Sequence, residues 1–297
     1  MAFHSGFVAV VGRANVGKST LVNRLVGEKV SITSDKPQTT RNRILAVLNQ
    51  PDAQIVFMDT PGIHKPRHLL GERMVRSAEQ AFSEVEVILF VVDAAAGPPG
   101  PGDRRLAERL AHVTPPVVLV LNKMDAMAPA RAAKITTSYR ELGDFVHVIT
   151  LSALTGENLG SLMDIILPLL PEGPRYFPAD MLTDQPERFL MSELIREKVL
   201  RLTREEVPHA VAVDVESIQP RKDDLLYVQA VIYIERESQK GIIVGERGAM
   251  LKEIGSLARR DIEALLGSRV YLDLWVKVKR DWRNREGSLQ MLGYQDG

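Results

Sequence analysis

The stretch Gly12-Arg13-Ala14-Asn15-Val16-Gly17-Lys18-Ser19 decides the fold, because it matches the pattern G-x-x-x-x-G-K-[ST]. The apolar run 7–11 precedes it and the amphipathic segment 19–26 follows it, so the pattern lies between a predicted strand and a predicted helix. Glycines in such a loop let backbone N–H groups turn towards phosphate oxygens, and the start of the helix adds its positive dipole. The stretch therefore predicts a phosphate-binding loop.

Two side chains of this loop indicate how it handles phosphates. Lys18 brings a compact positive charge to the β- and γ-phosphates, and the Ser19 hydroxyl can join the ligands of a Mg²⁺ ion. The residues expected to contact a nucleotide here are Gly12, Arg13, Ala14, Asn15, Val16, Gly17, Lys18, Ser19 and Thr20.

The first ~170 residues alternate short apolar runs with amphipathic stretches. The predicted strands are 7–11, 44–48, 55–58, 87–92, 117–121 and 146–151, and the predicted helices are 19–26, 72–84, 103–111, 130–142 and 159–170. Such alternation predicts an α/β domain with a mostly parallel sheet and helices on both faces. The Pro/Gly-rich segment 97–102 is expected to break the chain between two of these elements.

The segment Asn122-Lys123-Met124-Asp125 directly follows the predicted strand 117–121 and indicates which base is bound. Asp125 can accept hydrogen bonds from both the N1–H and the exocyclic amine of guanine, whereas adenine would leave this carboxylate unpaired. Ser152-Ala153-Leu154 follows the next strand, where a backbone N–H could meet the guanine carbonyl oxygen. In register with the phosphate loop, these segments predict a guanine nucleotide.

The segment Asp59-Thr60-Pro61-Gly62 ends the predicted strand 55–58. Asp59 is placed to hold Mg²⁺ through water, and the backbone N–H of Gly62 to sense a γ-phosphate.

The polar loop 31–42 contains Thr39 and Thr40, one of which should complete the Mg²⁺ ligands when GTP is bound. We favour Thr40, although either threonine could simply cap a helix or strand. The expected catalytic residues are Lys18, Thr40, Asp59 and Gly62, and the expected Mg²⁺ ligands are Ser19, Thr40 and Asp59.

Ile63 occupies the position where Ras-like enzymes place a glutamine that orients water, so hydrolysis should be slow or aided by another group. Arg41 and Arg43 are candidates to stabilise charge in the transition state. His64 and His68 have i, i+4 spacing and could pair on a metal, but two histidines without a third ligand are more often exposed loop residues.

The order of elements changes after the Pro-rich segment 171–178. A predicted helix, 186–202, precedes two alternating strands, 210–218 and 225–235, then a glycine-punctuated segment, a helix at 249–266 and a last strand at 270–279. We therefore expect a nucleotide-binding domain over residues 1–172, a linker over 173–185, and a second, α+β domain of order α-β-β-α-α-β over 186–297.

The segment Gly241-Ile242-Ile243-Val244-Gly245-Glu246-Arg247-Gly248 contains G-x-x-G between an apolar turn and a long helix. A KH domain clamps the backbone of about four single-stranded nucleotides with this element. The pattern alone is weak, but its place in the α-β-β-α-α-β order indicates a type II KH domain.

Charge around this segment supports nucleic-acid binding. Residues 236–285 hold twelve Lys and Arg against seven Asp and Glu, a net charge of +5, while residues 186–297 hold nineteen of each. A solvated charged face is the alternative explanation, and Trp282 could either stack on a base or pack. The residues expected to contact RNA are Gly241, Ile242, Val244, Gly245, Glu246, Arg247, Gly248, Lys252, Lys279, Arg280 and Arg283.

The composition of the whole chain excludes several other functions. Its 38 basic and 38 acidic residues balance, so no global field attracts nucleic acid or a membrane. The absence of cysteine excludes disulfides and thiolate sites. We find no signal-peptide pattern and no apolar run near the ~20 residues that span a bilayer, and we expect a cytosolic protein.

Taken together, these motifs resemble the Era family of bacterial GTPases over essentially the full length. The matching segments are 12–19, 37–41, 59–62, 122–125, 152–154, 183–189, 195–198 and 241–248. The phosphate loop is shared by thousands of unrelated proteins, whereas its combination with one C-terminal KH domain is specific to this family.

The resemblance implies a GTPase that binds the 3′ end of the small-subunit (16S) ribosomal RNA and assists maturation of the 30S subunit. It also implies that GTP favours the RNA-competent arrangement of the domains, and a cytoplasmic location with some association at the inner face of the membrane. Relatives with a hydrophobic residue at the position of Ile63 often use a potassium ion, and an asparagine matching Asn15 helps to hold it.

Two other functions fit parts of the sequence. A nucleotide-gated RNA-binding module with negligible hydrolysis would fit Ile63. A membrane or tRNA-modification GTPase would share the nucleotide motifs but carry a different accessory domain. A P-loop kinase or ATPase is disfavoured by the guanine-reading segment at 122–125.

Overall fold

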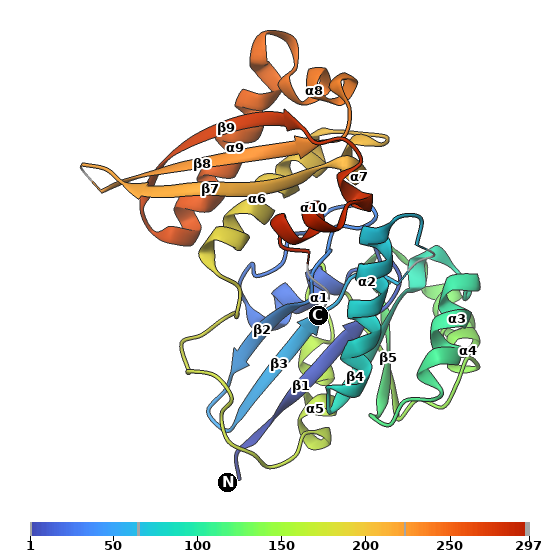
Figure 1. Cartoon of the computed structure of the whole chain (residues 1–297). Coiled ribbons are helices and arrows are strands. Elements are labelled where there is room, and N and C mark those ends of the chain that lie inside the picture. The colour runs from blue at the N-terminus through green and yellow to red at the C-terminus, as the bar shows by residue number, and fades with distance from the viewer. Residues whose placement is uncertain (1, 64–65, 223, 295–297) are drawn as a thin grey trace.

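The computed structural model describes residues 2–63, 66–222 and 224–294 of the 297-residue chain. The chain forms a six-stranded sheet in the order β2-β3-β1-β4-β5-β6 and a three-stranded sheet in the order β7-β8-β9 (Figure 1). This confirms the predicted α/β fold followed by an α+β fold.

The first sheet is parallel except at its β2 edge, which pairs antiparallel with β3. Its strands are β1 (His4–Val11), β2 (Ile44–Asn49), β3 (Ala53–Asp59), β4 (Val87–Asp93), β5 (Val117–Asn122) and β6 (His147–Thr150). The helices are α1 (Lys18–Val26), α2 (Leu69–Gln80), α3 (Pro101–Leu110), α4 (Pro129–Arg140) and α5 (Leu159–Ile166).

Helices cover both faces of this sheet, because its strands are apolar on both sides. One core packs α1 and α5 against the sheet, and the other packs α3 and α4 against the opposite face. The Pro/Gly break is shorter than predicted, since α3 begins at Pro101, whose missing N–H costs nothing in the first turn. Helix α2 begins three residues before the predicted Glu72, because His68 caps it.

The second sheet belongs to the predicted α+β half. Its elements are α6 (Glu187–Leu202), α7 (Val207–Ala210), β7 (Ala212–Pro220), β8 (Leu225–Ile234), α8 (Glu237–Val244), α9 (Ala249–Leu266), β9 (Arg269–Val278) and α10 (Glu286–Met291). Strand β8 pairs antiparallel with β7 and parallel with β9. Helices α6 and α9 lie behind the sheet in the view of Figure 1, and apolar side chains from both fill one core with it. The predicted glycine-punctuated segment is helical as far as Val244, with Gly241 inside α8.

The segment between the two halves runs along the first sheet. Gln54 accepts hydrogen bonds from the backbone N–H groups of Tyr176 and Phe177, and Val47 N–H donates to the carbonyl of Leu182 at 2.8 Å. The backbone of this segment is therefore held by hydrogen bonds to the first sheet although the segment has little regular structure. The domain boundaries proposed from sequence stay a prediction.

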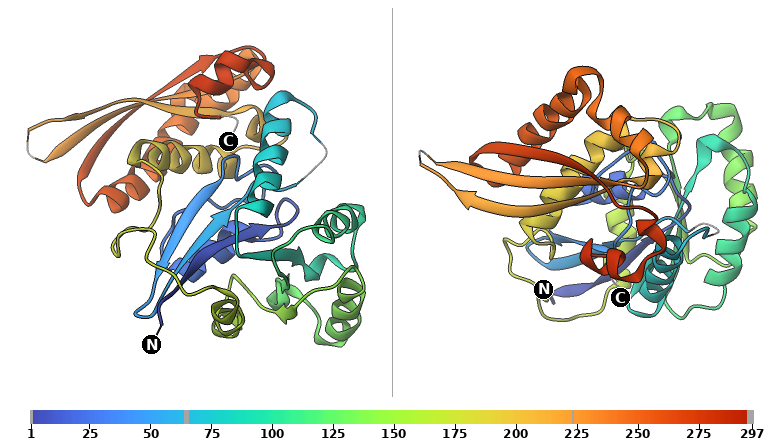
Figure 2. Two further views of the ribbon diagram at one scale, coloured as in Figure 1. Left: turned by 60° about the horizontal axis from the view of Figure 1, so that its bottom comes forward. Right: turned by 45° about the horizontal axis from the view of Figure 1, so that its top comes forward.

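The two halves meet where the C-terminal segment lies beside α2 (Figures 1 and 2). A small core there contains Leu70 and Met74 of α2 together with Trp282, Leu289 and Tyr294. Trp282 is 0% exposed, and its Nε1 donates to the carbonyl of Ala210 at 2.8 Å. Of the two roles considered for Trp282, the structure therefore supports packing.

Candidate nucleotide and RNA sites

The phosphate loop connects β1 to α1. Gly17 has φ 99°, and a Cβ at this position would lie 2.3 Å from Nδ2 of Asn122, so glycine is required. Lys18 is buried, and its Nζ donates to the carbonyl oxygens of Gly12 at 3.2 Å and Arg13 at 2.9 Å. Its ammonium group thus points into the loop that is expected to hold phosphates.

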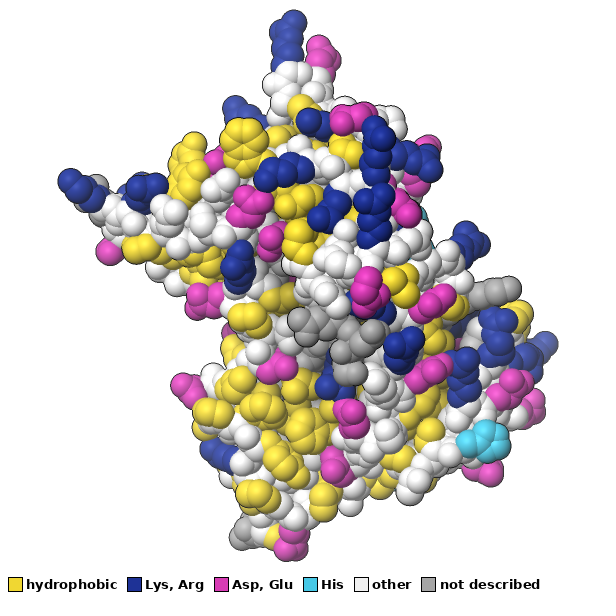
Figure 3. Space-filling model, in the orientation of Figure 1, with side chains coloured by type: hydrophobic (Ala, Val, Ile, Leu, Met, Phe, Trp, Pro, Cys, Tyr) yellow, Lys and Arg dark blue, Asp and Glu magenta, His cyan; other side chains and the backbone are white. Residues whose placement is uncertain are grey.

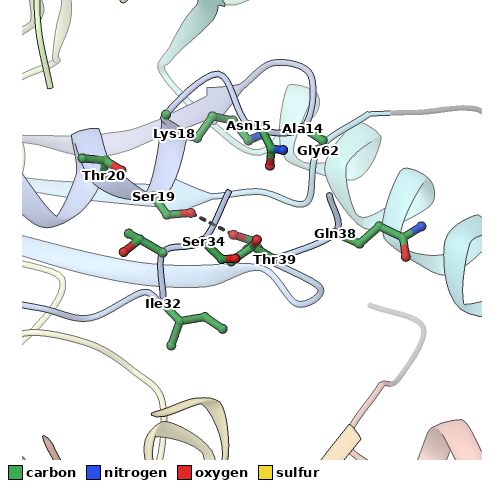
Figure 4. Close-up of a pocket in the computed structure, with 13 residues that line it drawn as sticks. Ala14, Asn15, Lys18, Ser19, Thr20, Ile32, Ser34, Gln38, Thr39 and Gly62 are labelled. Carbon is green, nitrogen blue, oxygen red and sulfur yellow. Dashed lines mark hydrogen bonds between the residues drawn. The ribbon is translucent and has the colours of Figure 1, made fainter. Parts of the chain in front are cut away.

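Three oxygen-bearing side chains from separate segments converge beside this loop. Ser19 Oγ lies 2.8 Å from Thr40 Oγ1, which lies 3.4 Å from Asp59 Oδ2. Figure 4 shows Ser19 facing the polar loop 31–42 (the switch loop) across the pocket. Thr39 instead donates to the carbonyl of Lys36 at 2.6 Å, which supports our choice of Thr40 over Thr39.

This oxygen cluster fits a Mg²⁺ ion. Asp59 is 0% exposed, and its Oδ1 has no hydrogen-bond partner among the described residues. A buried carboxylate oxygen without a partner is costly unless a ligand satisfies it, and Mg²⁺ prefers hard oxygen ligands. Ser19, Thr40 and Asp59 would hold the ion, directly or through water.

Burial shifts the pKa values of Lys18 and Asp59, the two charged groups of the site, away from their ordinary values. Burial lowers the pKa of Lys18 to about 8, although the nearby Asp59 carboxylate acts in the opposite direction. Burial also raises the pKa of Asp59, against the opposing effect of Lys18 and of the hydroxyls around it. Phosphate anions beside Lys18 and a cation beside Asp59 would each favour the charged form. The site is therefore suited to a metal–nucleotide complex.

The predicted base-binding segments also lie together. Asn122 Nδ2 donates to the carbonyl of Val16 at 2.9 Å, and Asn122 Oδ1 accepts from the N–H of Ala153 at 2.9 Å. Asp125 Oδ1 accepts from the Ser152 hydroxyl at 2.5 Å. Asn122 thus ties the phosphate loop to the segment 152–154, and the Ser152 hydroxyl orients the carboxylate expected to read guanine.

One residue of this region escaped the sequence analysis. Asp93 ends β4, and its Oδ2 accepts from Lys123 Nζ at 2.7 Å while the same ammonium donates to the carbonyl of Asn15 at 2.7 Å. Asp93 therefore positions Lys123 across the phosphate loop. An acidic residue closing the strand next to β5 was the available signal. Leu154 is exposed, and its carbonyl accepts a hydrogen bond from Arg24 at 2.8 Å.

The segment 59–62 packs directly on the phosphate loop. A Cβ at Gly62 would lie 2.7 Å from the backbone nitrogen of Ala14, and Thr60 Oγ1 donates to the carbonyl of Val10 at 2.9 Å. Pro61 is buried as well. Ile63 packs against the core on the α3 and α4 face, which agrees with its inability to orient water. Thr20 lines the pocket beside Ser19.

The candidate charge-stabilising arginines point elsewhere. Arg41 NH1 donates to the carbonyl of Val211 at 2.6 Å, and Arg41 NH2 to that of Pro208 at 3.2 Å, both in the second half of the chain. Arg43 pairs with Glu84. In this structure Arg41 is therefore engaged by the second half of the chain and Arg43 by Glu84, and neither is directed at the phosphate loop.

Two further predicted residues have structural partners. Asn15, the expected potassium-binding residue, donates from Nδ2 to the carbonyl of Asp35 at 2.6 Å and so links the phosphate loop to the switch loop. His68 Nδ1 accepts from the N–H of Gly71 at 2.9 Å and caps α2, which argues for a structural role. His64, the other half of the suggested metal pair, lies outside the described residues.

The G-x-x-G turn joins α8 to α9. Gly245 and Gly248 have φ of 71° and 82°, and a Cβ at Gly245 would lie 2.7 Å from that of Met250. Arg247 between them also has a positive φ, 51°. The turn needs these glycines, and Glu246 and Arg247 are exposed at its tip.

A groove of about 610 Å³ begins at this turn and runs between α9 and β9. It is lined by Gly248, Leu251, Lys252, Gly255, Ser256, Arg259, Val270, Tyr271, Leu272 and Leu274. Gly255 lets the helix approach β9, since a Cβ there would lie 3.3 Å from Leu274 Cδ1. Of the predicted RNA contacts, Gly248 and Lys252 line the groove. The glycine inside the amphipathic pattern of α9 was a signal that the sequence analysis missed.

The remaining residues predicted to contact RNA differ in exposure and in position. Ile242 is exposed on α8, whereas Val244 packs against the core and Gly241 lies inside the helix. Lys279 and Arg280 follow β9, where Lys279 Nζ lies 5.8 Å from the centre of the Tyr233 ring.

Arg283 lies apart from the groove. It pairs with Glu235 and lines a separate cavity of about 630 Å³ between the two halves of the chain. Of the two roles that the sequence left open for Trp282, stacking on a base is not possible in this structure, because Trp282 is buried at the interface.

Comparisons with known proteins agree with this geometry. A family model described as a 50S ribosome-binding GTPase matches residues 7–123, and a KH-domain model matches residues 206–283. The chain is 53% identical over 295 residues to a GTPase Era of Alkaliphilus oremlandii (strain OhILAs), covering 99% of this chain and 100% of the relative.

Two solved structures are similar over nearly the whole chain. One is Era in complex with MgGDPNP and nucleotides 1506–1542 of 16S ribosomal RNA, with a TM-score of 0.95, 44% identity, and coverage of 98% of this chain and 99% of the other. The second is a variant of Aquifex aeolicus Era bound to GDP.AlF4-, with a TM-score of 0.93, 44% identity and the same coverage.

Proposed function

Because the chain belongs to the Era family of GTPases, we propose that its GTP cycle controls the binding of ribosomal RNA by its KH domain. The protein is a GTPase, and its relative from Aquifex aeolicus was captured with GDP.AlF4-, which resembles a phosphoryl group in transfer. The proposal concerns how this activity is used and which residues carry it.

The nucleotide site has the groups that phosphoryl transfer requires. Lys18 would hold the β- and γ-phosphates, and the N–H of Gly62, which packs against Ala14 of the phosphate loop, would contact the γ-phosphate. Mg²⁺, present in the solved Era complex, would neutralise charge on the phosphates when bound. Its proposed ligands are Ser19, Thr40 and Asp59.

We propose that the RNA is the 3′ end of the small-subunit (16S) ribosomal RNA, and that binding assists maturation of the 30S subunit. The relative in the solved complex holds nucleotides 1506–1542, a fragment of 37 nucleotides. A KH groove clamps about four nucleotides, so an RNA of this length needs contacts outside the groove as well. The groove between α9 and β9 is the proposed starting point.

One structural feature carries the proposal, namely the anchoring of the switch loop in the KH half on both sides of Thr40. Arg196 of α6 donates to the carbonyl of Thr39, and Arg41 is buried among carbonyls of the KH half. Ile32 packs in the KH core as well. Thr40 already lies 2.8 Å from Ser19 Oγ, so the loss of its contact with bound Mg²⁺ after hydrolysis would release the switch loop and act on the KH half. This is how nucleotide state would reach the RNA groove.

Two finer elements of the proposal rest on the family resemblance. A potassium ion beside Asn15 would compensate for Ile63, and the protein would work in the cytoplasm with part of it at the inner face of the membrane. Within the described ranges we find no helix both long and apolar enough to cross a bilayer.

Competition binding and single-turnover hydrolysis test the proposed function. GTP should displace a bound guanine nucleotide where ATP does not, because Asp125 pairs with guanine. Hydrolysis should be slow in sodium and faster in potassium or with RNA. Equal competition by ATP would contradict the base assignment. The alternative of a membrane or tRNA-modification GTPase predicts that Gly248→Asp leaves RNA binding intact.

A further inference from the structure

The outer face of the three-stranded sheet carries four aromatic side chains. Tyr227 and Tyr233 lie on β8, and Tyr271 and Trp275 lie on β9. We call these four residues the aromatic face. Tyr271 is 58% exposed and Trp275 is 55% exposed, although large aromatic groups are costly to leave in water. Figure 3 shows hydrophobic side chains interspersed with Lys and Arg over this sheet.

The rings of the aromatic face are held in fixed positions. Tyr227 and Tyr271 stack with centroids 5.7 Å apart and ring planes 10° from parallel. The Tyr227 hydroxyl donates to Asp273 Oδ2 at 2.7 Å, and Trp275 Nε1 donates to the same oxygen at 3.1 Å. Because the ring edges are tied down, ordering these rings on a ligand costs little further entropy.

Cationic side chains border the rings. The Arg221 guanidinium lies 5.3 Å from the centre of the Tyr227 ring, and Arg269 is exposed at the start of β9. Lys277 pairs with Glu216 at 3.0 Å on the same face. Proteins bind single-stranded nucleic acids on surfaces of this kind, because the bases stack on exposed aromatic rings while the phosphates contact nearby Lys and Arg side chains.

The aromatic face is continuous with the KH groove. Tyr271 lines the groove between α9 and β9 and also stacks on Tyr227 of the outer face. Strand β9 is one of the two edges of the sheet, so an RNA strand leaving the groove needs to cross only β9 to reach the outer face. We propose that the aromatic face is a second RNA-binding surface, on which the strand that leaves the groove stacks bases against Tyr271 and Trp275, while Tyr227 supports the Tyr271 ring.

This inference rests on the proposed RNA-binding function and specifies where the RNA goes beyond the clamped nucleotides. A single-stranded RNA suits the surface better than a protein does. The rings carry polar edges already engaged by Asp273, and cations border them, whereas the centre of a protein interface is depleted of charge. Binding of a partner protein or of a second copy of this chain to the aromatic face would be an outcome of the test that contradicts the proposal.

The test compares nested single-stranded fragments from the 3′ end of the small-subunit rRNA, from about five to about twenty nucleotides long. For the full chain, affinity should rise with length. In Trp275→Ala this gain with length should shrink about tenfold, because a base stacked on an aromatic ring contributes ~1–3 kcal/mol. Leu265→Ala is the matched control, since Leu265 is also an exposed apolar residue but lies on α9 outside the groove.

Fluorescence gives a second reading of the same contact. The chain has two tryptophans, and Trp282 is 0% exposed, so a change of emission on adding long fragments should come from Trp275. The change should be absent with the shortest fragment and absent in Trp275→Phe. Tyr271→Ala should also weaken binding of the long fragments.

The outcomes separate the two proposals. If no fragment binds the wild-type chain, the proposed RNA-binding function fails, and this inference with it. If fragments bind and Gly248→Asp abolishes their binding, but Trp275→Ala keeps the full gain with length, only this inference fails. A dimer in sedimentation that Trp275→Ala dissociates would likewise overturn it in favour of a second copy.

Discussion

Single residues of the nucleotide site are tightly constrained by one another. Position 17 accepts only glycine, because the Asn122 side chain occupies the place that a Cβ would take. Asn122 in turn ties the phosphate loop to Ala153. Lys18 and Asp59 are buried together and are both destabilised in their charged forms. The site therefore gains its full stability only with its ligand present.

Replacing Gly17 should abolish nucleotide binding with little effect on the rest of the molecule. In Gly17→Ala the new methyl group must displace Asn122, and the φ of 99° is strained for alanine, so GDP affinity should fall by about 100-fold or more. Gly27→Ala is the matched control at the other end of α1. It has a φ of 85° but nothing within 4 Å of the added Cβ, so it should cost only about 1 kcal/mol of folding stability. Fluorescent-nucleotide titration and urea unfolding of both variants measure the two effects, and equal GDP affinities would contradict the role of Asn122.

Nucleotide binding should also weaken at alkaline pH. Burial lowers the pKa of Lys18 to about 8, and phosphates around the ammonium would raise it again. Lys18 is charged in both states below this pH, whereas above it the free protein is neutral at Lys18 and takes up a proton on binding. Affinity for GDP should therefore fall by up to about tenfold per pH unit above pH 8. Calorimetry in two buffers of different ionisation enthalpy counts the protons, and an uptake of zero at about pH 9 would show that the phosphates do not act on Lys18.

The switch loop is the element that joins the two activities. Its residue Arg41 lies 5.7 Å from the centre of the Trp282 ring and 5.9 Å from that of Tyr294, and it donates to backbone carbonyls of the KH half. A second link joins Lys29 to Glu197 and Asp261. The position of Thr40 is thereby tied to α6 and to the C-terminal segment.

Removing the Arg41 anchor should uncouple the domains. Arg41→Ala should bind GDP normally but lose the dependence of RNA affinity on nucleotide state, from the ~5–150-fold usual for allosteric coupling to less than about twofold. Arg41→Lys should not restore it, because an ammonium cannot reach several carbonyls as a planar guanidinium does. The measurement is RNA affinity with GDPNP and with GDP. Arg43→Ala is the control, since Arg43 pairs with Glu84 at the surface of the first half. Unaltered coupling in Arg41→Ala would refute the anchor.

Much of the fold follows from local sequence patterns. The strands of the first sheet are buried on both faces and are visible as continuous apolar runs, and the glycines of both loops mark turns that only glycine can make. Contacts between distant segments leave no such pattern. No local pattern in the sequence shows that Arg41 lies against the rings of Trp282 and Tyr294, or that Asp93 positions Lys123. The groove lining from α9 and β9 depends on how helix and strand approach, which a sequence pattern does not encode.

In the whole molecule, the switch loop and the small core between α2 and the C-terminal residues join two larger cores. Its net charge is zero, so RNA must be met by local surfaces rather than by a general positive field. The groove at Gly248 and the aromatic face supply such surfaces on the KH half, and the switch loop reaches that half from the nucleotide site. GTP binding and RNA binding are therefore expected to stabilise each other.

The most direct measurement is the affinity of the full chain for a 3′-terminal small-subunit rRNA fragment, with Mg²⁺ and either GDPNP or GDP bound. A γ-phosphate that keeps Thr40 at the Mg²⁺ site should make RNA binding at least about fivefold tighter with GDPNP than with GDP. By reciprocity, the same RNA should tighten GDPNP by the same factor. Equal RNA affinities in the two nucleotide states would contradict a GTP-controlled RNA-binding protein.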